Sequence, residues 1–192
     1  MILIIAGSTR ADSYTRAAAR AIEGALGRRS GDPVLWDLAV RPLPIADPEY
    51  HEQPAANPDP AVHELVELAG AADGFVLATP VYHNSYSGVL KNCLDHLVIE
   101  HFMEKPVALC GFCRQYTAIQ AIDHLRIVVR GLYGMAIPAQ MLTVPSDFER
   151  DEEGRWRLAG RAALQRLDGV VDMLLRHVRI RQALLAATAS KG

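Results

Sequence analysis

The chain alternates short apolar runs with segments of helical spacing, and this alternation constrains the fold more than any other feature. Runs that are apolar throughout are typical of strands covered on both faces. Strands are predicted at residues 2–6, 34–38, 74–78, 106–111 and 135–144, and helices at residues 13–26, 61–71, 87–99, 115–132 and 159–178. Regular alternation of the two predicts an α/β fold, with a parallel sheet and right-handed crossovers.

Length and composition set further limits. A chain of 192 residues, 50% of them hydrophobic, fits one domain over residues 1–192 that buries a sheet between two helical layers. The 20 Lys and Arg nearly balance the 22 Asp and Glu, so no strong field favours nucleic acid or an anionic membrane. The first run lacks a basic leader and is too short to span a bilayer. Three cysteines are too few for a disulfide framework, so a cytoplasmic protein is expected.

Three stretches fall outside the alternation. Residues 41–60 carry five prolines with a sixth at their end, which predicts a long irregular connection that forms a wall or lid over the site. Residues 145–157 are polar and predict a surface loop. The Ala-rich residues 182–192 predict either a frayed, mobile tail or an arm across a dimer.

Two polar loops follow the first and third predicted strands. The first reads Gly-Ser-Thr-Arg-Ala-Asp-Ser at residues 7–13, and the second reads Thr-Pro-Val-Tyr-His-Asn-Ser at residues 79–85. In a sheet of order 2-1-3-4-5, the carboxyl ends of strands 1 and 3 lie side by side at the switch point where ligands bind. The two loops therefore predict a single site.

The first loop has the chemistry of a phosphate site. A loop that opens a helix presents free N–H groups and the positive end of the helix dipole. Ser8, Ser13 and Thr15 add hydroxyl donors, and Arg10 can fork onto phosphate oxygens. The loop matches neither a triphosphate nor a dinucleotide pattern, which favours a monophosphate such as that of FMN. The alternative is a polar turn in which Ser13 only caps the helix.

The second loop and the helix after it resemble the NADPH-dependent FMN reductase family. Thr-Pro-x-Tyr-x-Asn-Ser at residues 79–85, then Gly-Val-Leu-Lys-Asn-x-Leu-Asp at 88–95, is similar to the family pattern T-P-E-Y-N-G-S-x-P-G-x-L-K-N-x-x-D. The first loop resembles the family's G-S-x-R-x-x-S, and the resemblance covers about residues 1–178. It implies a flavodoxin-like three-layer sandwich with a five-stranded parallel sheet of order 2-1-3-4-5. Azoreductases, quinone reductases and chromate reductases share the pattern.

The resemblance also implies site residues. The FMN phosphate would be held by Ser8, Arg10, Ser13 and Thr15, and the isoalloxazine would be lined by Pro80, Val81, Tyr82, His83, Asn84 and Ser85. Backbone donors near the pyrimidine edge would stabilise the negative charge that hydride transfer to N5 leaves around N1 and C2=O. Stacking of nicotinamide on flavin makes orientation the main contribution to catalysis, so we assign no catalytic side chain and no metal.

The chain departs from the family pattern at three places. His83 and Asn84 stand for the usual Asn and Gly, so either the loop bends differently or Asn84 adopts the left-handed conformation. His83 then either donates to the flavin or the acceptor, or contributes mainly its backbone. His96 replaces an aromatic residue and is expected to be packed or at an interface. Bulky residues after strand 4 narrow the pocket, where the carried-over cofactor contacts are Gly111, Arg114 and Gln115.

Two smaller motifs have competing interpretations. Cys110 and Cys113 have the C-x-x-C spacing, which fits either a strand end plus a loop residue or a thiol pair reacting beside the flavin, while a zinc site lacks two further ligands. Lys91 and Asp95 are spaced as an exposed helical ion pair. In the family this helix packs in a dimer interface, and its apolar residues favour a homodimer or homotetramer, with each flavin near a subunit boundary.

The leading hypothesis is an FMN-dependent NAD(P)H oxidoreductase. NADPH or NADH would reduce bound FMN, and the flavin would pass electrons to free flavin, a quinone, an azo compound, a metal oxyanion or a biosynthetic intermediate. A flavin-dependent monooxygenase is a candidate partner. The alternatives are a flavodoxin-like electron carrier, which a net charge of −2 does not favour, and a binding module that has lost the flavin.

Overall fold

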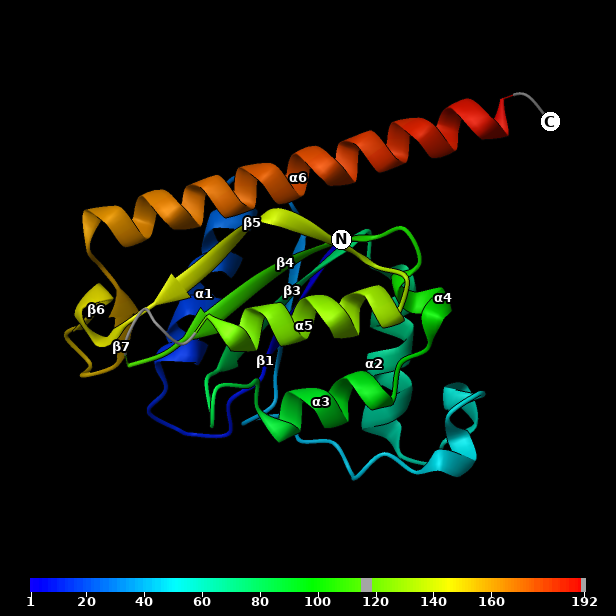
Figure 1. Ribbon diagram of the computed structural model, residues 1–192, viewed down its shortest axis with the longest axis horizontal. Coiled ribbons are helices and arrows are strands. Elements are labelled where there is room, and N and C mark those ends of the chain that lie inside the picture. Colours follow the sequence, from blue (N-terminus) through cyan, green and yellow to red (C-terminus); the bar gives the residue numbers. More distant parts are fainter. Residues whose placement is uncertain (115–118, 191–192) are drawn as a thin grey trace.

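The computed structural model describes residues 1–114 and 119–190, and its centre is a five-stranded parallel sheet of order β2-β1-β3-β4-β5 (Figure 1). The strands are β1 (Ile2–Ala6), β2 (Pro33–Asp37), β3 (Gly74–Pro80), β4 (Pro106–Phe112) and β5 (Met135–Thr143). This is the predicted flavodoxin-like order. It places β1 beside β3, with Ala6 paired to Ala78 near their carboxyl ends.

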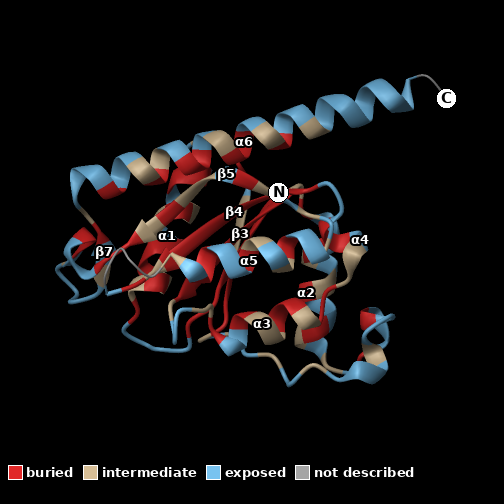
Figure 2. Cartoon of the chain, viewed as in Figure 1, coloured by how far each residue is buried: buried red, intermediate tan, exposed pale blue. Residues whose placement is uncertain are grey.

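Helices cover both faces of the sheet (Figures 1 and 2). One layer holds α1 (Tyr14–Gly27) and α6 (Arg161–Ala189), and the other holds α2 (Pro60–Ala71), α3 (Gly88–Asp95), α4 (Ile99–Phe102) and α5 (Gln120–Gly131). Within β1, Ile2 and Ile4 pack with the first layer, while Leu3 and Ile5 pack with the second. Alternate side chains thus enter different cores, which explains why the run is apolar throughout.

Helix α3 is shorter than its predicted range of 87–99. Ser87 caps it by accepting the N–H of Leu90 at 3.3 Å, and the helix ends at Asp95. Val98 is extended, and its N–H donates to His101 Nδ1 at 3.0 Å, so the chain begins a separate turn, α4.

The apolar side chains of residues 89–99 mostly serve the chain's own core. Leu90, Cys93, Leu94 and Leu97 are buried, whereas Val89 is 37% exposed. These side chains therefore leave little apolar surface on α3 for an oligomer interface. Lys91 Nζ lies 2.5 Å from Asp95 Oδ1 in the expected exposed pair.

The prediction of a surface loop at residues 145–157 is wrong, because this segment contains a hairpin. β6 (Phe148–Arg150) pairs antiparallel with β7 (Trp156–Leu158). The apolar side chains at positions 148, 156 and 158 turn inward, while the charged residues between them face solvent and make the segment polar overall. We call residues 148–158 the β6–β7 hairpin.

The end predicted for the last helix, at residue 178, is also wrong. Helix α6 continues to Ala189 and extends past the sheet (Figure 1), so the segment expected either as a frayed tail or as an arm is helical to that residue. Residues 179–189 contain neither Gly nor Pro and are rich in Ala and Leu, so nothing in the local sequence ends the helix.

The proline-rich segment packs against α3. It contains two single turns, η1 (Pro48–Tyr50) and η2 (Pro54–Ala56). Asn92 Nδ2 donates to the Pro44 carbonyl at 2.7 Å, and the buried His96 places Nε2 3.0 Å from the same oxygen. His96 is thus a packed histidine, as predicted.

Gly7, directly after β1, permits a close approach that a larger residue would prevent. A Cβ there would lie 2.8 Å from Leu90 Cβ and 3.0 Å from the Ala78 carbonyl oxygen. We expect Gly7→Ala to lower the free energy of unfolding by about 1–3 kcal/mol, because the clash is with a backbone atom and a Cβ. Gly27→Ala is the control, since nothing lies within 4 Å of the added Cβ. Urea unfolding measures both, and equal midpoints would contradict the close approach.

Candidate functional site

Buried hydrogen bonds tie the two polar loops together. The Gly7 N–H donates to the Ala78 carbonyl at 2.7 Å, which joins the ends of β1 and β3. Ser87 Oγ donates to the Gly7 carbonyl at 2.6 Å, and the Ser87 N–H donates to Thr79 Oγ1 at 2.9 Å. Ser87 and Thr79 are themselves buried. The loops therefore share one rigid base.

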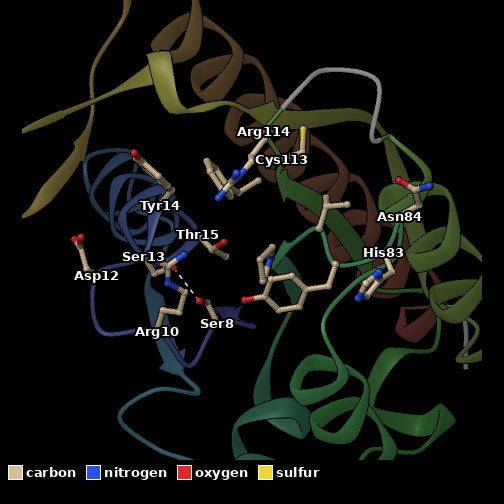
Figure 3. A pocket seen from close by; sticks show the side chains of 14 residues that line it. Ser8, Arg10, Asp12, Ser13, Tyr14, Thr15, His83, Asn84, Cys113 and Arg114 are labelled. Carbon is tan, nitrogen blue, oxygen red and sulfur yellow. Dashed lines mark hydrogen bonds between the residues drawn. The ribbon is translucent and has the colours of Figure 1, made fainter.

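A pocket of about 610 Å³ lies between the loops, within the usual size range of small-molecule sites (Figure 3). Its lining includes residues predicted from both loops and from the end of β4: Ser8, Arg10, Ser13, Thr15, Pro80, Val81, Tyr82, His83, Asn84 and Arg114. Four more residues line it that were not among the predicted contacts: Asp12, Tyr14, Phe112 and Cys113. The proline-rich segment contributes none of the described lining residues, so it is not a lid over this pocket.

The first-loop side of the pocket is built to receive an anion. Ser13 Oγ donates to Ser8 Oγ at 2.9 Å, and both side chains are buried, as is Thr15. Ser13 also accepts the N–H of Arg16 and so begins α1, whose positive end opens on the pocket. Arg10 is exposed at the rim. Hydroxyls, a helix N-terminus and a guanidinium together suit a phosphate.

Arg16 fixes the shape of this loop. Its Nε donates to Asp37 Oδ2 at 2.6 Å, and its Nη1 donates to the Ala11 carbonyl at 2.8 Å and the Arg10 carbonyl at 3.4 Å. The partial negative charges of two loop carbonyls are thereby compensated. The sequence did not predict this role of Arg16, because its partner Asp37 lies on a different element, β2.

The second loop makes a tight turn with two left-handed residues. The N–H groups of Tyr82 and Ser85 each donate to the other residue's carbonyl at 2.9 Å. Between them, His83 has φ of 48° and Asn84 has φ of 61°, as a type I′ turn requires. Of the two alternatives for this loop, a left-handed Asn84 is the one observed. Histidine and asparagine tolerate this conformation better than most residues.

Two predicted residues that the structure describes, Ser85 and Gly111, do not line the pocket. The Ser85 hydroxyl instead lies 3.0 Å from His124 Nδ1 on α5. Gly111 is buried within β4, where a Cβ would approach Leu142 Cδ2 to 3.0 Å, so its small size serves packing. Gln115 lies outside the described residues.

An aromatic cluster forms the wall next to the first loop. The Phe112 ring stacks on Tyr14 with centroids 4.6 Å apart. Tyr14 also contacts Phe148 at 4.8 Å and Trp156 at 4.5 Å from the hairpin. Phe112, the first of the bulky residues expected after the fourth strand, is the last residue of β4 in the structure. Its ring packs against Tyr14 and forms part of the pocket wall. Arg114 is exposed and lines the pocket beside it (Figure 3).

The two cysteines of the C-x-x-C motif have different settings. Cys110 lies in the core, and burial raises the pKa of its thiol to about 12. Cys113 is buried at the pocket lining, with Sγ 3.9 Å from the Thr143 carbonyl oxygen. Since a thiolate at Cys110 is rare near neutral pH, the geometry favours a strand end plus a loop residue.

Two further searches cover the described parts of the chain. Within residues 1–114 and 119–190, no group of three His, Cys, Asp or Glu side chains is arranged to hold a metal ion. No helix in the same residues is long and apolar enough to cross a membrane.

Comparison with known proteins finds relatives along most of the chain. The sequence profile of the family described as NADPH-dependent FMN reductase matches residues 1–149. The FMN-dependent NADPH-azoreductase of Staphylococcus saprophyticus is 35% identical over 177 residues, which cover 92% of this chain and 94% of that protein. The enzyme of the same name from Staphylococcus aureus is 39% identical over 156 residues, or 81% and 83% of the two chains.

Solved structures share the fold at lower identity. FerB, a flavoenzyme NAD(P)H:(acceptor) oxidoreductase from Paracoccus denitrificans, superposes with a TM-score of 0.72 at 19% identity, covering 93% of this chain and 96% of that one. The apo form of an NADH:FMN oxidoreductase, EMOB, superposes with a TM-score of 0.70 at 24% identity. The match covers 94% of this chain and 88% of that one. These likenesses bear on the fold alone.

The left-handed turn gives a prediction for ligand binding. A β-branched residue at the φ of Asn84 costs about 1–3 kcal/mol, so Asn84→Val should depopulate the turn and raise the Kd for FMN about tenfold. Asn84→Gly removes the strain and should bind FMN as well as the natural chain does. Fluorescence titration compares them, and equal affinities of the two variants would count against the turn.

Proposed function

The chain belongs to the NADPH-dependent FMN reductase family, and we propose that the pocket between its two loops binds FMN. Membership makes the chain an FMN-dependent NAD(P)H oxidoreductase. The observation that carries the site proposal is the buried Ser8 and Ser13 hydroxyl pair at the start of α1, placed across one pocket from the His83–Asn84 turn. The phosphate belongs with the hydroxyls and the ring with the turn.

The residues of the first loop fit a phosphate and leave little to rearrange. The Ser8 and Ser13 hydroxyls are already held 2.9 Å apart, and Arg16 and Asp37 brace the loop from behind. A preformed anion site avoids the ordering cost that a mobile loop would add to binding. Arg10, at the exposed rim, supplies a charge-assisted contact that can form as the ligand arrives.

The residues of the second loop orient the ring. Tyr82 and Ser85 use their N–H groups within the turn, so His83 and Asn84 at its tip are the residues positioned to donate backbone hydrogen bonds to the ligand. When bound, FMN supplies the centre that accepts a hydride from NAD(P)H and passes electrons on. The protein positions the reactants, and its fixed donors stabilise charge without reorganising.

The exposed side of the pocket is where we place the acceptor. His83 and Arg114 line it and are exposed to solvent. We propose a small-molecule acceptor among free flavin, a quinone, an azo compound, a metal oxyanion and a biosynthetic intermediate, and the names of the two relatives favour an azo compound. We also propose a flavin-dependent monooxygenase as a partner. We further propose that the protein is a homodimer or homotetramer and that it is cytoplasmic.

Anaerobic mixing of the FMN-loaded protein with NADPH, and separately with NADH, tests the function. We expect the visible flavin absorbance to bleach rapidly with at least one of them. A yellow protein that bleaches with neither would point to an electron carrier instead. A colourless protein that cannot bind added FMN would contradict both proposals.

Arg10 tests the phosphate end of the site. We expect Arg10→Ala to raise the Kd for FMN about tenfold, because a hydrogen bond to a charged group contributes about 1.5–3 kcal/mol. Riboflavin, which lacks the phosphate, should bind equally well to both forms. Lys91→Ala removes a cation on α3 and serves as the control. Equal FMN affinities of the two variants would refute the phosphate assignment.

A further inference from the structure

The β6–β7 hairpin lies against the start of α1 and almost entirely beyond the part of the chain that the family profile matches. The profile ends at residue 149, whereas β7 runs to Leu158. The hairpin rests on the first helix through Tyr14, whose ring lies 4.5 Å from Trp156 and 4.8 Å from Phe148. Because Tyr14 also lines the pocket, the hairpin supports the cofactor site from outside.

Arg150 of this hairpin forms a bidentate ion pair with Asp12 in the first loop. Its Nη1 donates to Asp12 Oδ1 at 2.8 Å, and its Nη2 donates to Asp12 Oδ2 at 2.7 Å. The guanidinium is itself held in place, since Nη1 also donates to the Gly154 carbonyl at 2.6 Å and Cζ lies 3.7 Å from the Trp156 ring centroid. A two-pronged contact of this kind needs arginine and fixes the direction of the carboxylate.

Asp12 is the residue of the first loop that least suits a phosphate. It lines the same pocket as Ser8, Arg10 and Ser13, and its carboxylate carries the same sign of charge as the ligand (Figure 3). Hydrogen bonding from Arg150 holds the pKa of Asp12 below its usual value, so the group stays ionised near neutral pH. Without Arg150, an ionised Asp12 would keep only the compensation from Trp156 and Arg10, and it would leave more negative charge on the loop that receives the phosphate.

The ion pair contributes little to folding, so its removal is a fair test of binding. Arg150 is 43% exposed and Asp12 is 54% exposed at their side chains, and exposed pairs add little stability. The apolar contacts of Phe148 and Leu158, both buried, hold the hairpin in place independently of this pair.

We propose that the β6–β7 hairpin is a positioning element of the FMN site, in which Arg150 neutralises Asp12 and fixes it at the rim so that the phosphate can bind the first loop. This inference rests on the proposed function. The β6–β7 hairpin would thus contribute to ligand binding although, of its residues that the structure describes, only Arg150 contacts the first loop through an ion pair.

Titrations with FMN and with riboflavin test the inference. Arg150→Gln should raise the Kd for FMN about five- to tenfold, since it exposes the phosphate to a like charge, and should change the Kd for riboflavin less than about twofold. Arg155→Gln is the matched control: Arg155 is an exposed arginine of the same hairpin that pairs with Asp151 and Glu153, away from the first loop. It should leave both affinities unchanged.

A rescue variant separates charge from structure. Asp12→Asn combined with Arg150→Gln removes both charges and should return the Kd for FMN to within about twofold of the natural chain's value. The inference is overturned if Arg150→Gln weakens FMN and riboflavin binding alike, or if the double variant stays weak. Should Arg150→Gln fail to fold by circular dichroism, Asp12→Asn alone decides: it should bind FMN at least as tightly as the natural chain, and weaker binding would overturn the inference. A natural chain that binds neither flavin would instead refute the proposed function.

Discussion

The site depends on the parallel pairing of β1 with β3. This pairing brings Ala6 level with Ala78, and the bond from the Gly7 N–H to the Ala78 carbonyl extends it one residue beyond β1. Ser87 then joins the first loop to the start of α3 through the Gly7 carbonyl. Because the sheet order reverses between these two strands, their connections leave on opposite faces and a crevice opens between them. The lining residues of the two loops take their positions from that junction.

The sequence predicts the sheet well because the evidence for each strand is local. A strand buried on both faces is apolar along most of its length, and this holds for β1 and for residues 74–78 of β3. The missed hairpin shows the limit of this reasoning. Its strands, Phe-Glu-Arg and Trp-Arg-Leu, have only three residues each and half of their side chains are charged, so their average composition resembles that of a polar loop. The extension of α6 was missed for a related reason: an Ala-rich end predicts fraying as readily as helix.

Some site residues can likewise be predicted from short motifs, whereas others depend on contacts between distant parts of the chain. Ser13 as a cap, the hydroxyls around it and the left-handed Asn84 all follow from short motifs. The roles of Arg16 and Asp12 do not, because their partners come from other elements, Asp37 on β2 and Arg150 on β6. No spacing rule links positions 138 residues apart. Gly111 shows the converse case: its place beside a ligand loop predicts a cofactor contact, whereas in the structure it does not line the pocket and its small size serves packing against Leu142 and Ile122.

The distribution of strain and charge suggests how such a site can vary without losing its cofactor. Apart from the exposed Arg10, the parts that would hold FMN are backbone groups or buried hydroxyls, and both are fixed by the sheet junction. Among the described residues that differ from the family pattern, His83 and Arg114 are exposed at the pocket mouth, and Phe112 packs in the aromatic wall. Hydride transfer between stacked rings depends on orientation more than on a particular acid or base. Substitution at the mouth can therefore alter which acceptor fits, while the junction of β1 and β3 keeps the flavin in place.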